Sequence, residues 1–154
     1  MMSNVEIKER LLIICKEELN KQLHSLINAM DVAQGEANEH IGAMESRYDS
    51  FKEEAQQRVS GFARQIDEKK GQLPLLSSIN PSTVSDKVQH GSIVKTIGRN
   101  YFFSAYIFTD PVEVGGELYF PVGIDSPIGN HFVGKSAGDT VTFNENSIEL
   151  ISVF

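Results

Sequence analysis

Four carboxylates in the first third of the chain have the spacing that a metal site needs. Glu36 and Glu39 are three residues apart, and Glu45 and Asp49 are four residues apart. Carboxylates at these spacings share one face of a helix and can together hold one divalent cation, with water in the positions that Mg²⁺ leaves open. The sequence therefore offers two acidic pairs as candidate metal ligands.

The same carboxylates also have a purely structural explanation. Acidic residues near the start of a helix interact favourably with the helix dipole, and exposed loops are usually polar. The residue types alone do not choose between the two explanations. What favours a functional role is the place of these carboxylates at the end of two long helices.

The sequence offers no zinc motif. It has no cysteine pair, and its four histidines are far apart: His24, His40, His90 and His131. The single cysteine, Cys15, lies within an apolar helical stripe, where a small buried hydrophobic residue is the expected role. We expect the protein not to be an enzyme in its own right.

Composition and charge narrow the class of protein. The 154 residues carry a net charge of −7, which divides into −3 for residues 1–72 and −4 for the remainder. Neither part has the basic excess that binding to free nucleic acid normally requires. One cysteine excludes an internal disulfide, and the longest apolar run near the start, Leu11 to Cys15, is far too short for a membrane span. We expect a soluble cytoplasmic protein with no membrane partner.

Residues 1–72 are predicted to form an antiparallel coiled-coil hairpin. Good helix formers dominate this segment, and apolar residues recur every three or four positions on each arm. The stripes are Leu12, Cys15, Leu19, Leu23, Leu26 and Met30, then Met44, Tyr48, Phe51, Ala55, Val59, Phe62 and Ile66. Their pairing is symmetric about residue 37, and a slip of one heptad moves the turn to residues 38–43. We place the tip between Gln34 and Ala43, with arms about 45 Å long.

The rest of the chain is predicted to be a linker, residues 73–89, and a small antiparallel β domain, residues 90–154, so the fold class is α+β. Pro74 and Pro81 interrupt the helical pattern. Segments rich in β-branched and aromatic residues then follow, and Gly115-Gly116 signals a hairpin turn. The expected strands are 92–96, 100–108, 112–114, 117–124, 140–143 and 148–153, and Pro127 opens a short helix that Gly134 ends.

Three spaced elements near the C-terminus carry a resemblance to a known family. They are Ser126-Pro127-Ile128-Gly129, Phe132-Val133-Gly134-Lys135 and Gly138-Asp139-Thr140-Val141, and His90 to Val94 and Ile148 to Val153 agree with flanking strands. In this order they resemble the C-terminal domain of the Gre transcription elongation factors (GreA and GreB), over residues 90–154. The hairpin resembles that family in architecture rather than residue by residue.

The resemblance implies an FKBP-like C-terminal domain that docks on the rim of the RNA polymerase secondary channel, while the hairpin enters the channel. The docking surface carries over to Asp125, Ser126 and Pro127, with Ile128 beside them. Two acidic residues at the tip would help to hold an Mg²⁺ ion shared with the polymerase active site, so that backtracked RNA is cleaved. The nearest match to that acidic pair is Glu36 and Glu39, and a second alignment selects Glu45 and Asp49.

The tip also departs from the family pattern. Glu36 stands where the family has aspartate, and Ile41-Gly42-Ala43 does not reproduce the residues that follow in the family. A glutamate is one methylene longer, which displaces a ligand by about an ångström, and a shift of that size can cost ~10²-fold in rate. The resemblance therefore leaves two activities open, transcript cleavage or occupation of the channel without cleavage.

Two functions of other classes compete with this hypothesis. The hairpin could serve as a stand-alone coiled-coil interaction module, in which case the mass in solution would depend on concentration, whereas a Gre-like factor is expected to be a monomer. A prolyl isomerase is suggested by fold analogy alone, and the Gre-type version of the fold is not one.

Overall fold

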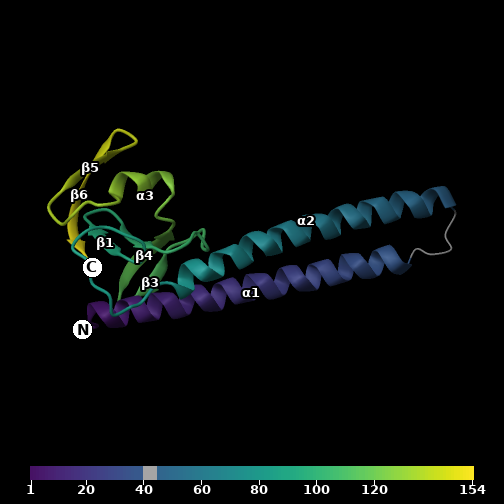
Figure 1. Cartoon of the computed structure of the whole chain (residues 1–154), viewed down its shortest axis with the longest axis horizontal. Coiled ribbons are helices and arrows are strands. Elements are labelled where there is room, and N and C mark those ends of the chain that lie inside the picture. The colour runs from purple at the N-terminus through teal and green to yellow at the C-terminus, as the bar shows by residue number, and fades with distance from the viewer. Residues whose placement is uncertain (40–44) are drawn as a thin grey trace. The chain divides into compact units, whose positions relative to one another are not determined.

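The computed structural model of the chain describes residues 1–39 and 45–154, and for residues 37–39 and 45–51 it describes the backbone alone (Figure 1). The chain divides into two compact units. The hairpin unit is Glu17–Leu73, and the sheet unit combines Met1–Lys16 with Pro74–Phe154.

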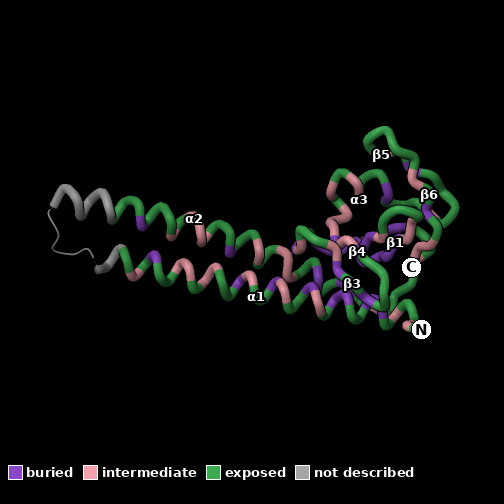
Figure 2. The backbone as a smooth tube through the Cα atoms, turned by 180° about the vertical axis from the view of Figure 1, so that it is seen from behind, coloured by how far each residue is buried: buried purple, intermediate pink, exposed green. Residues whose placement is uncertain are grey.

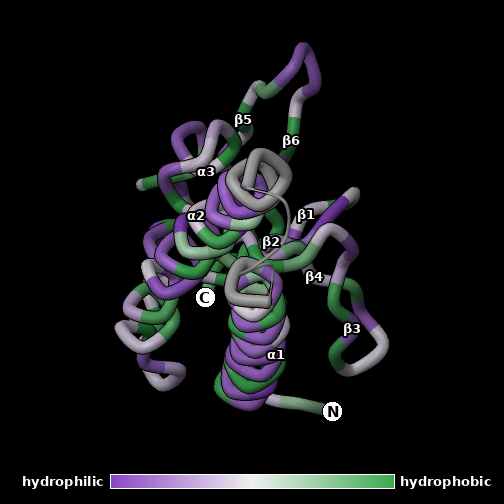
Figure 3. Tube along the Cα trace, turned by 90° about the vertical axis from the view of Figure 1, so that its right-hand side faces the viewer, coloured by the Kyte–Doolittle hydropathy of each residue, from purple (hydrophilic) through white to green (hydrophobic). Residues whose placement is uncertain are grey.

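Two long helices account for the first half of the chain. Helix α1 is Asn4–Glu39 and helix α2 is Glu45–Ser77. The predicted stripes are confirmed in part. Leu12, Cys15, Leu19, Leu23, Ala55 and Ile66 are buried, whereas Leu26, Met30, Val59 and Phe62 are half-buried. Apolar and hydrophilic residues alternate along α1 (Figure 3). No helix within the described residues is long and apolar enough to span a membrane.

The ends of the helices differ from the prediction in two places. A turn centred on residue 37 is wrong because α1 continues to Glu39; Gly35 alone costs a helix only about 1 kcal/mol relative to alanine. Of the alternative turn at residues 38–43, residues 38–39 belong to α1, and the rest lies outside the described residues. Helix α2 continues to Ser77 with Pro74 inside it, so the segment predicted as linker, 73–89, begins within the helix. The division into three domains stays a prediction.

The strands of the sheet unit form one mixed sheet of six strands in the order β3-β4-β2-β1-β6-β5. This confirms the α+β fold class. In the described chain the strands are β1 (Ile93–Thr96), β2 (Asn100–Phe103), β3 (Val112–Val114), β4 (Glu117–Val122), β5 (Thr140–Phe143) and β6 (Asn146–Val153).

One strand pair departs from the antiparallel prediction. Strands β2 and β4 are parallel, with Tyr101 opposite Phe120, because the chain between them passes to the edge strand β3 before it returns as β4. The hairpin turn at Gly115-Gly116 is confirmed, and both glycines have the positive φ angles of a type I′ turn. Asn144 and Glu145 adopt positive φ in the corresponding turn between β5 and β6.

An aromatic cluster joins helix α3 (Pro127–Phe132) to the sheet. The Phe132 side chain is fully buried and meets the rings of Tyr101 and Phe103 edge-on, with centroid distances of 5.4 and 5.9 Å. Val94, Val141 and Leu150 belong to the same core, and buried residues of the sheet gather mainly around β1 and β4 (Figure 2). The cluster fixes α3 against the sheet and with it the residues that precede the helix.

The first turns of α1 belong to the sheet unit, and Cys15 lies among their buried residues. Its side chain is fully buried, which confirms the expected role as a small hydrophobic residue. Burial raises the pKa of the Cys15 thiol to about 12, and a hydrogen bond with Ser104 acts in the opposite direction. Because the thiolate is the reactive form, the folded protein keeps this cysteine unreactive.

We expect Cys15 in the native protein at pH 8 to react with a disulfide reagent such as DTNB at least about 100-fold more slowly than in guanidinium chloride. Absorbance of the released thiolate measures both rates. The double variant Cys15→Ala/Lys16→Cys is the matched control, since position 16 is exposed on the same helix, and it should react rapidly without denaturant. Equal rates in native and unfolded wild type would contradict the buried placement.

Candidate functional site

The start of α3 presents the predicted docking residues in one continuous segment. Ser126 is the N-cap: its hydroxyl donates to the Gly123 carbonyl at 2.6 Å and accepts the Gly129 N–H at 3.1 Å. Pro127 occupies the first helical position, where its missing N–H costs nothing. Asp125 and Pro127 are exposed, and Ile128 is half-buried. The side chains of Asp125 and Pro127 are thus available to a partner, whereas Ser126 is engaged within the fold.

Gly129 explains how closely the helix approaches the preceding chain. A Cβ atom built at Gly129 would lie 2.2 Å from the Ile124 carbonyl oxygen, a distance that no side chain can occupy. The residue is buried, so neither backbone can move away without opening the core. Glycine at this position therefore allows α3 to lie against residues 123–124.

The other signature residues are mainly structural. Gly134 and Gly138 have φ angles of +79° and +91°, which a side chain rarely adopts. The Asp139 carboxylate accepts the Ser136 N–H at 2.8 Å, and the Lys135 carbonyl accepts the Val88 N–H at 2.8 Å. These contacts close the loop between α3 and β5. Val133 and Lys135 are exposed as well, so exposure alone does not distinguish the segment before α3 from the rest of the signature.

An open groove of about 790 Å³ adjoins this segment. Aromatic and aliphatic residues from separate parts of the sheet unit dominate its lining, which includes Tyr101, Tyr106, Phe120, Ser126, Pro127, Ile128, Phe143 and Ile148. The Arg99 guanidinium lies over the Phe120 ring, 4.7 Å from its centroid. A groove of this kind can accept apolar side chains of a protein partner.

Sequence reasoning singled out the segment 125–128, whose docking role stays a prediction, and it missed most of the groove. Tyr106 is 60% exposed and lies in a stretch that was expected to be a strand, although β2 ends at Phe103. Tyr106 could have been identified as a groove residue because it is an aromatic residue in a loop close to a signature element. Phe120 and Phe143 carry no such signal, because alternation along a strand does not say which face borders a groove.

The hairpin carboxylates are partly described. Glu36 lies on α1, and its carboxylate accepts a hydrogen bond and forms an ion pair with Arg58 of α2 at 2.5 Å. Both side chains are about half exposed, and such pairs typically contribute 0–1 kcal/mol. Glu39 is the last residue of α1, whereas Glu45 and Asp49 lie in the first turns of α2. The side chains of these three residues are outside the described part of the chain.

A metal site among the predicted ligands therefore stays a prediction. Within the side chains that the structure describes, no group of three or more His, Cys, Asp or Glu residues could hold a metal ion. The carboxylate is the donor type that Mg²⁺ prefers, so the chemistry of the predicted pairs fits. The Arg58 contact shows that Glu36 would have to exchange its ion pair for a metal bond.

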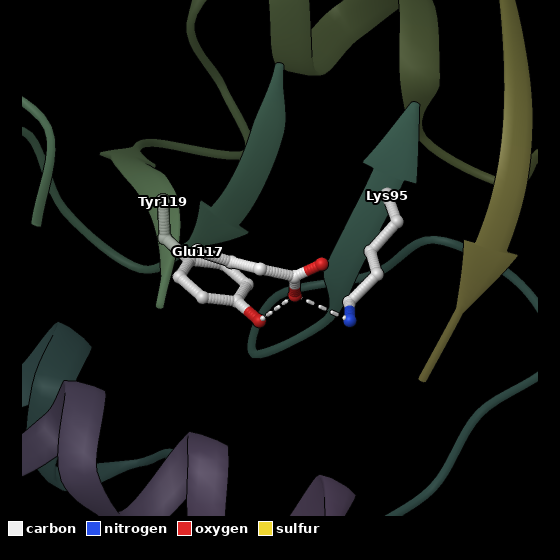
Figure 4. A network of polar contacts seen from close by, with 3 residues as sticks. All are labelled: Lys95, Glu117 and Tyr119. Atoms are coloured by element: carbon white, nitrogen blue, oxygen red, sulfur yellow. Dashed lines mark hydrogen bonds and ion pairs between the residues drawn. The ribbon is translucent and has the colours of Figure 1, made fainter. Parts of the chain in front are cut away.

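A separate polar network stabilises the sheet between β1 and β4 (Figure 4). The Glu117 carboxylate accepts hydrogen bonds from the Lys95 ammonium at 2.7 Å and from the Tyr119 hydroxyl at 3.0 Å. The Lys95 bond, followed by the Tyr119 bond, lowers the pKa of Glu117 below its ordinary value of 4.5. The ionised Glu117 carboxylate therefore contributes its full stabilisation at pH values above its ordinary pKa. This stabilisation is lost as the pH falls through the lowered pKa.

Comparisons with known proteins find similarity in solved structures. One is the GreA factor homolog 1 (Gfh1) protein of Thermus thermophilus, 17% identical, with 90% of this chain and 93% of that chain covered and a TM-score of 0.36. A second structure, of the transcription factor Gfh1, is 17% identical, with 89% and 91% covered and a TM-score of 0.35. No protein-family model and no curated protein matches the chain.

We expect Ser126→Ala to lower the free energy of unfolding by about 1 kcal/mol, because it removes the cap of α3. Chemical denaturation followed by circular dichroism measures the change. Ser126→Thr keeps the hydroxyl and should lose much less. The control Ser147→Ala alters an exposed residue of β6 and should leave stability within about 0.5 kcal/mol; a loss equal to that of Ser126→Ala would contradict the capping role.

Proposed function

We propose that this protein is a Gre-type transcription elongation factor that binds RNA polymerase and inserts its hairpin into the secondary channel. The observation that carries the proposal is the segment Asp125 to Ile128, held rigidly at the start of α3 beside an open apolar groove. The same segment carries the sequence resemblance to the Gre C-terminal domain. In this proposal the protein acts in the cytoplasm as a monomer and binds no free nucleic acid.

In the proposed docking surface, the apolar groove supplies binding energy, and the exposed charge of Asp125 affects the rate and specificity of binding. Apolar side chains of the polymerase rim would enter the groove beside Tyr106 and Phe120, where burial of apolar surface supplies most of the binding energy. Asp125 lies at the side of this contact and is exposed. A negative charge at the rim of an interface chiefly affects the association rate and the choice of partner.

The length of the hairpin unit is what this proposal requires for entry into the channel. From Glu17 to Glu39, helix α1 covers 23 residues, which corresponds to about 35 Å at 1.5 Å per residue. Within the hairpin unit, Leu19, Leu23 and Ala33 of α1 and Ala55 and Ile66 of α2 are buried. In this proposal the hairpin unit brings its carboxylates to the polymerase active site.

The carboxylates of Glu36 and Glu39, or of Glu45 and Asp49, would supply ligands for an Mg²⁺ ion shared with the polymerase. In phosphoryl transfer, two metal ions stabilise the attacking and leaving oxygens. This chain would contribute only the position and charge of its carboxylates. The protein has no catalytic activity of its own in this proposal, and the polymerase cleaves its backtracked transcript.

A second candidate is a regulator that occupies the channel without cleavage, and the ion pair between Glu36 and Arg58 favours it. A carboxylate already paired with a guanidinium carries less negative charge toward a metal ion. The glutamate at position 36 also favours this candidate. Its side chain is one methylene longer than the aspartate of the family pattern, so it presents its oxygen at a different distance.

Cleavage of a stalled, backtracked transcript tests the proposal. Purified RNA polymerase of the source organism is incubated with wild type, Glu36→Ala/Glu39→Ala or Glu45→Ala/Asp49→Ala, and product length is followed on a gel. We expect wild type to accelerate cleavage, and one double variant to lose about 10²-fold of the stimulated rate while it still binds. The control Glu53→Ala/Glu54→Ala removes two exposed carboxylates from α2 and should act as wild type.

The other outcomes are equally informative. Binding with an unchanged or lowered cleavage rate would establish the channel-occupying regulator in place of the cleavage factor. Failure of wild type to bind the polymerase would contradict both candidates.

A further inference from the structure

Lys8 is a buried lysine without an acidic partner. On the first turns of α1 its side chain is 4% exposed, and its ammonium donates one hydrogen bond to the Thr83 carbonyl at 2.8 Å. Within the described side chains the ion pairs are Arg58 with Glu36 and Lys95 with Glu117, and neither includes Lys8. Burial lowers the pKa of Lys8. The ammonium also lies over the Phe154 ring, 5.9 Å from its centroid. Lysines are almost never fully buried unless they are paired, and neither the carbonyl nor the ring supplies a full negative charge, so this ammonium can take an anion.

A small polar cavity lies against Lys8. It has a volume of about 150 Å³, and its lining includes Lys8, Ser78, Asn80, Thr83, His90 and Ser92, with no aspartate or glutamate. All of these residues belong to the sheet unit. A water molecule takes a share of about 30 Å³ in the liquid, so the cavity is large enough for a polyatomic ion.

Some donors around the cavity are already used, since the Ser78 hydroxyl donates to the Leu75 carbonyl at 3.1 Å and His90 Nε2 lies 2.7 Å from the same oxygen. Other donors remain, on Asn80, Ser92 and Lys8. Asn80 uses its side-chain oxygen to accept the Ser82 N–H at 3.0 Å, which leaves its amide N–H groups for a ligand. Ser92 likewise accepts the Gln89 N–H at 3.0 Å through its hydroxyl oxygen, which leaves the O–H. The Lys8 ammonium has two further protons beyond the one given to Thr83. A positive charge and a surplus of N–H and O–H donors match an anion that accepts several hydrogen bonds.

We propose that this cavity binds a phosphate group, with Lys8 as its charge partner. The donors come from Lys8 of α1, from Asn80 in the loop after α2 and from Ser92, the residue before β1, so more than one side of the ligand is contacted. A tetrahedral oxyanion offers acceptors in all of these directions, whereas a carboxylate offers two oxygens in one plane. The phosphate group would tie the first turns of α1 to residues 78–92.

The site is independent of polymerase binding, because none of its residues belongs to the segment 125–128 or to the hairpin carboxylates. The ligand could be free phosphate or the phosphoryl group of a nucleotide. Both sources supply the same chemistry, and separate arms of the experiment distinguish them.

Binding of inorganic phosphate to the full chain tests the proposal. The thermal midpoint and the ³¹P NMR line width are measured at constant ionic strength, with chloride as the reference anion. We expect phosphate to raise the midpoint of wild type progressively with concentration and to broaden the ³¹P line. Lys8→Met should weaken affinity at least about 10-fold, because a charge-assisted hydrogen bond is lost. The control Lys16→Met, with the same charge change at an exposed position of α1, should bind as wild type.

Asn80→Ala provides a second variant at an exposed position, so the test does not depend on how Lys8→Met folds; it should weaken affinity several-fold. Tighter binding of adenosine monophosphate than of phosphate would identify a nucleotide as the source, and equal or weaker binding would identify free phosphate. Absence of any response of wild type beyond that to chloride would overturn the proposal, as would equal affinity in wild type, Lys8→Met and Asn80→Ala.

Discussion

The edge-on contact of Phe132 with Tyr101 and Phe103 is the interaction on which the sheet unit depends. It places the last residue of a six-residue helix in the centre of the core and holds the first residue at the surface. The buried Gly129 allows the close approach that this requires, and the Ser126 cap completes the first turn. The accessible residues Asp125 and Pro127 therefore have fixed positions without being buried themselves, which is the arrangement that a docking surface needs.

The hairpin depends on a different constraint, the regular burial of small and aliphatic side chains between two helices. Ala33 and Ala55 are buried near the distal end, and Leu19 and Ile66 are buried further along. Such a hairpin is suited to carry charge over a distance, and in our proposal it carries carboxylates into the polymerase.

The sequence predicts the helices and strands better than it predicts how the strands pair and which residues line the groove and the cavity. Strands close to those expected follow from runs of β-branched and aromatic residues and from Gly115-Gly116, whose turn needs positive φ angles. The parallel pair of β2 and β4 could not be predicted, because pairing is set by the path of the whole chain. Pro74 suggested a helix end, yet the fully buried Leu76 holds the last turn of α2 in place. The groove and the Lys8 cavity each combine residues from distant segments, so periodicity gives no sign of them.

Binding to RNA polymerase through the segment before α3 is the central claim, and fluorescence anisotropy of the labelled full chain with purified core polymerase tests it most directly. Asp125→Lys reverses an exposed charge within the proposed surface, and Asp86→Lys makes the same change at an exposed position elsewhere in the sheet unit. The account predicts that wild type and Asp86→Lys bind alike, and that Asp125→Lys binds at least about 10-fold more weakly. Equal affinities for all three proteins, or no binding by wild type, would contradict it.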